Sequence, residues 1–176
     1  MKKTLIIISA AIITCAFVAA TEWKADEKNS TVKFDLPGHA GTFSNLAASI
    51  NFDKKSLADS KISATIDVKT LKTGNEKLDG HLLSPDFFDA EKFPKITFTS
   101  SEIKTTDSGF LAKGTLNMKD STKVIELPFN FTEDGKKKAT FTGTMTVMAS
   151  EYGVIKKVKK PGDDKVLIYL VVPVTK

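Results

Sequence analysis

The side chains that could carry acid–base, nucleophilic or metal chemistry are few in this chain. Its 176 residues include two histidines and one cysteine. His81 lies close in sequence to Asp79 and Asp86, and a histidine oriented by a carboxylate can act as a general base. The same residues could instead form a local hydrogen bond that holds this segment to a neighbouring loop. We favour the local bond, because no obvious nucleophile and no second histidine accompany His81.

The other histidine gives no stronger signal. His39 stands in the stretch PGHAG, residues 37–41, which predicts a loop whose glycines could allow close approach of a ligand head group. Neither histidine belongs to a metal-ligand motif such as HExxH, and the sequence has no Gly-x-Ser-x-Gly elbow or phosphate-binding loop. The sequence therefore predicts no catalytic residue, no metal and no cofactor. An enzyme built on His81 is the weakest of three functional hypotheses.

Residues 1–20 have the form of a secretory signal peptide. Two lysines precede an uncharged apolar run that ends in small residues, Val18-x-Ala20. A membrane helix is the alternative, but it needs about 20 apolar residues and this run is shorter. We expect cleavage, a single mature domain over residues 21–176, and export to the periplasm or exterior of a bacterium.

The single cysteine lies inside this segment. Cys15 could be the acceptor of a lipoprotein signal, but Thr14 before it fits such a site poorly. We expect Cys15 to be lost with the signal peptide. The mature chain then needs no disulfide and offers no thiol chemistry.

The formal net charge is +5, and the densest lysine runs are residues 136–138 and 156–160. No aromatic residues interleave with these lysines, so the sequence does not predict nucleic-acid binding. We expect both runs to be solvated ends of hairpins. Transient contact with an anionic membrane surface is the alternative for them.

Beyond residue 30 the dominant period is two, which is typical of half-buried antiparallel strands. Turn residues such as Asp107-Ser108-Gly109 and Glu133-Asp134-Gly135 separate the alternating segments, and residues 161–164 form a third such turn signal. The short links predict a sandwich or an up-and-down barrel. The alternating segments are residues 32–36, 46–52, 62–68, 95–99, 110–118, 125–131, 139–147 and 166–174.

The pattern breaks once, between residues 73 and 94, where we expect a short helical insertion near residues 75–90. Leu78 and Leu82 are four positions apart and share one helical face. Ser84-Pro85 predicts the start of a second short turn, and Pro94 ends the insertion before the next strand. Such an insertion could cover the open end of a barrel.

The inward rows mix large residues such as Phe129 and Met145 with small ones, which are Ala64, Ala112, Gly114 and Gly143. Small residues opposite large ones can fill a core, or they can leave a cavity. A barrel of about eight strands is wide enough for either outcome. The pattern alone does not decide between them.

The insertion also carries a resemblance to a known family. Residues 73–100, TGNEKLDGHLLSPDFFDAEKFPKITFTS, are similar to the hallmark segment of the YceI-like family, T-G-N-x-x-x-D-x-H-L-x-S-x-D-F-F-D-x-x-x-[FY]-P-x-I-x-F. Weaker similarity extends through residues 30–53, 114–131 and 150–174. The sequence departs from the family pattern at Asp120-Ser121, where relatives usually have a glycine nearby, so that hairpin turn could differ.

The resemblance implies an exported bacterial protein with an extended, lipocalin-like antiparallel barrel of about eight strands. It implies non-enzymatic binding, with transport or storage, of a long isoprenoid lipid, either a polyprenyl chain or an isoprenoid quinone, in an apolar tunnel. Each buried methylene would contribute roughly 0.8 kcal/mol. The strand phase predicts these lining residues: Phe34, Phe43, Ile66, Leu82, Phe88, Phe98, Leu116, Met118, Leu127, Phe129, Phe141, Met145, Ile168 and Leu170.

The second functional hypothesis is an exported stress- or adhesion-related structural module whose barrel core is filled. Under either hypothesis, antiparallel strand edges could pair two copies into a homodimer. For Phe87 and Phe88 we expect one ring to pack the insertion onto the barrel and the other to border the tunnel, without an assignment of which does which.

Overall fold

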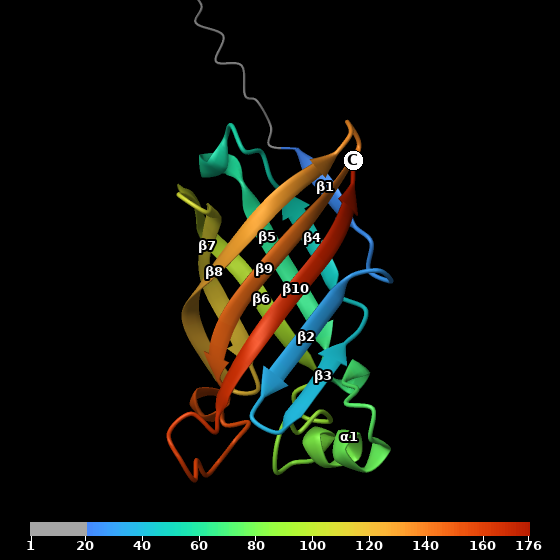
Figure 1. Cartoon of the computed structure of the whole chain (residues 1–176), viewed down its shortest axis with the longest axis vertical. Coiled ribbons are helices and arrows are strands. Elements are labelled where there is room, and N and C mark those ends of the chain that lie inside the picture. The colour runs from blue at the N-terminus through green and yellow to red at the C-terminus, as the bar shows by residue number, and fades with distance from the viewer. Residues whose placement is uncertain (1–20) are drawn as a thin grey trace, which may run out of the picture.

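A computed structural model describes residues 21–176 as one sheet of antiparallel strands that curls into a barrel, with a single α-helix below one open end (Figure 1). The predicted signal peptide and Cys15 lie outside the described residues. The strands are β1 (Glu22–Ala25), β2 (Thr31–Leu36), β3 (His39–Phe43), β4 (Ala47–Asn51), β5 (Lys61–Asp67), β6 (Lys95–Thr106), β7 (Gly109–Met118), β8 (Ser121–Asp134), β9 (Lys138–Met148) and β10 (Lys165–Thr175).

The ten segments form eight barrel strands, because two of the strands are interrupted. β1 and β2 pair in succession with the same edge of β10, with Ala25 opposite Val174 and Thr31 opposite Val171. On the other side, β1 pairs with β4 and β2 pairs with β3, so β4 and β3 together form the next barrel strand. The pairing of β1 with β10 closes the ring. The prediction of an all-β, lipocalin-like barrel of about eight strands with one helical insertion is confirmed.

The wall between β3 and β5 is completed at the lower end by a segment that is not a strand. Thr42 and Lys72 exchange backbone hydrogen bonds of 2.8 and 2.9 Å. Lys72 follows the short helix η2 (Val68–Thr70), and two further short helices are η1 (Leu57–Asp59) and η3 (Ala149–Tyr152). The insertion therefore attaches directly to the barrel wall.

The helix α1 (Glu76–Leu83) begins where the sequence provides a cap, since the Asn75 side chain accepts from the backbone N–H groups of Lys77 and Leu78. Ser84 ends α1, and its carbonyl accepts from the N–H groups of Phe87 and Asp89. The predicted insertion is thus a helix shorter than residues 75–90, followed by the second turn that Ser84-Pro85 indicated.

Two local expectations were wrong, and one short strand was not predicted. His39 is not in a loop: it opens β3 opposite Leu36, because Pro37-Gly38 alone makes the turn with Gly38 at φ +83°. The alternation also missed β1, a segment of four residues. Residues 161–164 do not form a tight hairpin, because β9 and β10 are joined by the longer connection 149–164, which contains η3.

Lys119 and Asp120 are the only two residues between β7 and β8. The turn from β7 to β8 places Lys119 at φ +55°, a conformation that glycine adopts more readily. A lysine therefore occupies the strained position in the turn, and its side chain has a role described below.

The core at the end of the barrel away from α1 is a cluster of aromatic rings. Phe52 is 1% exposed, and its ring centroid lies 5.0–5.6 Å from those of four other phenylalanines. Trp23 caps the cluster, donating from Nε1 to the Phe52 carbonyl at 3.0 Å. The four neighbours of Phe52 are Phe110, Phe129, Phe131 and Phe141. We call this the filled end.

Candidate functional site

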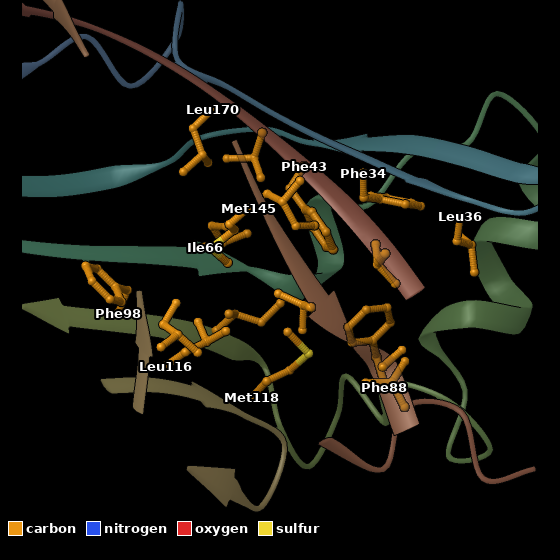
Figure 2. Close-up of a pocket in the computed structure, with 18 of the residues that line it drawn as sticks. Phe34, Leu36, Phe43, Ile66, Phe88, Phe98, Leu116, Met118, Met145 and Leu170 are labelled. Carbon is orange, nitrogen blue, oxygen red and sulfur yellow. The ribbon is translucent and has the colours of Figure 1, made fainter. Parts of the chain in front are cut away.

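The other half of the barrel is hollow. A cavity of about 770 Å³ runs from the aromatic cluster to the mouth beside α1, and we call this half the hollow end. Figure 2 shows its apolar side chains pointing inward from opposite walls. All fourteen residues that the strand phase predicted line this cavity, which are Phe34, Phe43, Ile66, Leu82, Phe88, Phe98, Leu116, Met118, Leu127, Phe129, Phe141, Met145, Ile168 and Leu170. Their contact with a ligand stays a prediction.

The pleat explains why these residues meet although they are far apart in sequence. Ile168 of β10 lies opposite Phe34 of β2 on one side and Met145 of β9 on the other. Residues directly opposite in an antiparallel pair point to the same face. Once the inward face of each strand is assigned correctly, all the alternate residues of that strand point into the barrel.

Sequence reasoning named Leu82 and Phe88 of the insertion but missed much of the rim at the mouth. The wall residues omitted from the prediction, such as Val32 and Ile62, belong to the same alternating rows and carried the same signal. The rim residues left off the predicted list lie mostly in loops and in the insertion, where no strand period places them. They are Pro37, His39, Leu78, His81, Phe87, Lys157, Lys159 and Asp163.

The small inward residues divide into two groups. Ala64 and Gly143 line the cavity. Gly114 does not, because a Cβ at this position would lie 2.7 Å from Cζ of Phe98, and Ala112 is completely buried. Gly114 therefore accommodates a large neighbour, and so does Gly143, where a Cβ would lie 3.0 Å from the Pro128 carbonyl oxygen and 3.3 Å from Cδ1 of Leu127. Ala64 borders the open space.

The two phenylalanines of the insertion have different neighbours. Phe88 packs edge-on against Phe43 of the barrel wall, with ring centroids 6.0 Å apart. Phe87 packs against His81 within the insertion, at 4.6 Å. Both line the cavity, so Phe88 joins the insertion to the barrel and Phe87 borders the mouth.

The hydrogen bond that holds the insertion is made by Asp79, not by His81 as predicted. Asp79 is 5% exposed and accepts from the Thr73 hydroxyl at 2.6 Å and the Thr73 backbone N–H at 2.7 Å. These bonds, with the Lys72 ammonium 3.6 Å away, hold the pKa of Asp79 below its ordinary value. Among residues 21–176 no carboxylate orients the His81 ring, and so the proposed general-base pair is not formed.

Two side chains connect segments across the mouth. The Lys119 Nζ donates to the carbonyls of Phe87 and Gly153 at 2.5 and 2.9 Å. Lys156 forms an exposed ion pair with Asp86 at 3.2 Å. The insertion and the connection 149–164 are thereby held together beside the opening.

The described part of the chain holds no group of three or more His, Cys, Asp or Glu side chains placed to bind a metal ion. Within the same residues, no helix combines the length and apolarity that crossing a membrane requires.

The sequence pattern of the YceI-like domain matches residues 23–174 of this chain. The chain belongs to the YceI-like family. Among curated relatives, a UPF0312 protein of Photorhabdus laumondii is 30% identical over 145 residues, covering 77% of this chain and 76% of the relative. The predicted membership of the YceI-like family is thereby confirmed.

Solved structures agree with this YceI-like fold. BcnA of Burkholderia cenocepacia superposes with a TM-score of 0.78 at 24% identity, covering 85% of this chain and 98% of that chain. A polyisoprenoid binding domain from Saccharophagus degradans superposes with a TM-score of 0.69 at 14% identity, covering 87% of this chain and 97% of the domain. At these identities the likeness establishes the fold.

Proposed function

We propose that this YceI-like protein binds a long apolar isoprenoid lipid, a polyprenyl chain or the tail of an isoprenoid quinone, and stores or carries it. The observation that carries the proposal is the hollow end, a continuous cavity in a barrel whose other end is filled. The description of the Saccharophagus degradans relative as polyisoprenoid-binding supports the same class of ligand.

The size and lining of the cavity suit one folded or bent apolar chain. Its volume of about 770 Å³ lies within the roughly 300–1,000 Å³ of sites that bind small molecules. Met118 and Met145, which are unbranched and polarizable, reach into it, and such side chains adapt to irregular apolar shapes. The walls offer hydrophobic burial, while the polar groups gather at the rim.

The proposal needs no covalent step. His81 is packed against Phe87, and the nearest sequence carboxylate, Asp79, is occupied by Thr73 and Lys72. We therefore propose a binding protein, not an enzyme. We also propose that residues 1–20 direct export to the periplasm or exterior, where a carrier could protect an insoluble chain from water.

The hypothesis of a structural module with a filled core required large side chains throughout the interior. The aromatic cluster meets that condition at one end only, since the cavity occupies the other. The geometry therefore favours the lipid-binding hypothesis.

The direct test is organic extraction of the purified protein followed by mass spectrometry. We expect an extractable isoprenoid lipid from the native host. Uptake of an added polyprenol, measured as co-elution of the lipid with the protein on gel filtration, would show the same capacity. An empty protein that also takes up no polyprenol would contradict the proposal.

A matched pair of variants assigns any binding to the cavity. Ala64 lines it, while Thr65 lies one residue further along β5 on the opposite face. Ala64→Phe fills the space and should lower polyprenol uptake about tenfold or more, whereas Thr65→Phe adds the same ring outside and should leave uptake unchanged. Equal uptake by the two variants would place the lipid elsewhere.

A further inference from the structure

The rim of the hollow end combines the cavity opening with a basic, partly apolar loop. Residues 156–160 read Lys-Lys-Val-Lys-Lys, and all five are exposed. Lys157 and Lys159 also line the cavity. Val158 between them is 42% exposed, one of four large apolar side chains that are at least 41% exposed in the described chain. The lysines are therefore grouped around the opening.

The loop presents these residues from a fixed base. Tyr152, Val154 and Asp164 are buried at its two ends, and Ser150 donates a hydrogen bond to the Asp164 carboxylate. Lys119 adds its bond to Gly153 at 2.9 Å. The tip is consequently held beside the mouth.

The acidic groups near the tip are mostly engaged. Asp86 pairs with Lys156, and Asp163 accepts from the Lys160 backbone N–H at 3.0 Å. Lys157, Lys159 and Lys160 have no ion pair within 4.0 Å in the described chain. Three cations without an ion pair and one exposed valine thus lie on the loop beside the opening.

We propose that this rim docks the hollow end onto the surface of an anionic lipid bilayer, so that an apolar chain can pass between membrane and cavity without crossing water. The inference rests on the proposed function, because a lipid too insoluble to diffuse must be exchanged with a membrane. A lysine held near an anionic membrane contributes attraction that adds over neighbouring lysines, and an apolar side chain at the same site can insert at the interface.

The molecule contains its own control. Lys136 and Lys137 lie in the turn between β8 and β9 and Lys138 opens β9, at the filled end, opposite the mouth in Figure 1. This segment has three lysines but neither an opening nor an exposed large apolar residue. If charge alone caused membrane binding, the lysines at both ends would bind an anionic bilayer equally. The proposal requires that binding depend on the lysines at the hollow end.

The experiment measures co-sedimentation of the protein, purified after expression of the full-length chain, with vesicles of phosphatidylcholine containing phosphatidylglycerol. The rim variant carries Lys157→Gln, Lys159→Gln and Lys160→Gln, and the control carries Lys136→Gln, Lys137→Gln and Lys138→Gln. Intact mass must show the same N-terminus in all three proteins, and circular dichroism must show the same fold.

We expect the wild type to bind anionic vesicles in a salt-sensitive manner, the rim variant to bind about 100-fold more weakly, and the control to stay within about threefold of wild type. Equal losses in both variants, or no loss in either, would overturn the proposal. Val158→Ser should weaken vesicle binding less, by about threefold. Unchanged binding by this variant would show that Val158 does not contribute to the interface with the membrane.

A separate measurement distinguishes the two proposals. Farnesol uptake by the wild-type protein without vesicles tests the cavity alone. Vesicle binding through the rim without any farnesol or polyprenol uptake would overturn the lipid-binding function. Uptake without vesicle binding would overturn the docking surface and leave the binding function intact.

Discussion

The two ends of this barrel are built from the same alternating strands but finish in opposite ways. At the filled end, Phe52 contacts four rings at 5.0–5.6 Å and Trp23 closes the cluster. At the hollow end, Met118, Met145 and Ile168 face a space of about 770 Å³. The two ends of one sheet can therefore have different roles. The rings packed at the filled end stabilise the fold, and the hollow end leaves apolar side chains free to line a cavity.

This division explains how a chain with a cavity can remain folded. An empty apolar space lowers stability, since its lining loses dispersion contacts. The aromatic cluster offsets that loss with close ring pairs, which add to their burial about 0.5–1.5 kcal/mol each. Substitutions made separately at the filled end and at the hollow end should test directly whether the two ends contribute differently to stability.

The largest expected effect lies at the filled end. Phe52→Ala removes a ring that is 1% exposed and should lower the free energy of unfolding by about 3–5 kcal/mol. Phe88→Ala, at the hollow end, removes a half-buried ring that already borders the cavity, so its loss should be about 1 kcal/mol while polyprenol uptake falls. Urea unfolding of both variants measures the difference. Equal losses would mean that the ends do not differ energetically.

The next effect concerns the Lys119 bonds across the mouth. Lys119→Met keeps the length of the side chain but removes the donors to Phe87 and Gly153. A hydrogen bond made by a charged group contributes about 1.5–3 kcal/mol, so amide exchange in residues 84–89 and 153–160 should become about tenfold faster. Lys104→Met, at an exposed pair with Glu102, serves as the control and should leave that exchange unchanged.

The third effect depends on pH and on Asp79. Because the folded protein lowers the pKa of this carboxyl through Thr73 and Lys72, its contribution to stability is complete above the ordinary Asp pKa of about 3.9 and is lost as pH falls through the lowered value. Asp79→Asn should be less stable at pH 7, and its stability should fall less steeply below pH 4. Parallel pH profiles for wild type and variant would contradict this assignment.

The smallest effect is expected at the exposed pair between Lys156 and Asp86, which are 58% and 78% exposed. Asp86→Asn should change the free energy of unfolding by less than about 1 kcal/mol, since solvent and salt screen such a pair. Chemical unfolding at low and high salt measures it. A larger, salt-insensitive loss would show that the rim contributes more to the fold than its exposure indicates.

Much of the hollow end followed from local sequence. A strand places alternate side chains on opposite faces, so Phe34, Leu116 and Leu170 could be assigned to the interior from their own strands. β1 escaped the prediction because a segment of four residues holds too little alternation. His39 was placed in a loop because the flanking glycines concealed a two-residue turn at Pro37-Gly38.

The rim could not be predicted in the same way. Phe87, Lys119 and Gly153 meet through backbone carbonyls and one ammonium group, and no periodic pattern links positions so distant in sequence. The partner of Asp79 was also missed: the sequence places His81 nearby, but on the folded insertion Thr73 is the residue within hydrogen-bond reach. Lys119 itself lies in a turn with φ of +55°, where its type gave no indication of its role.

By itself, the sequence determined most of the strands, their inward rows, the place of the helical insertion and membership of the YceI-like family, because each of these depends on residue order over short stretches. Only the tertiary structure decided which end of the barrel is filled and which is hollow. That outcome depends on distances between side chains on opposite walls, such as Phe52 and Phe129 at 5.6 Å. These distances are set by strand pairing and register, which bring together residues that local alternation treats alike.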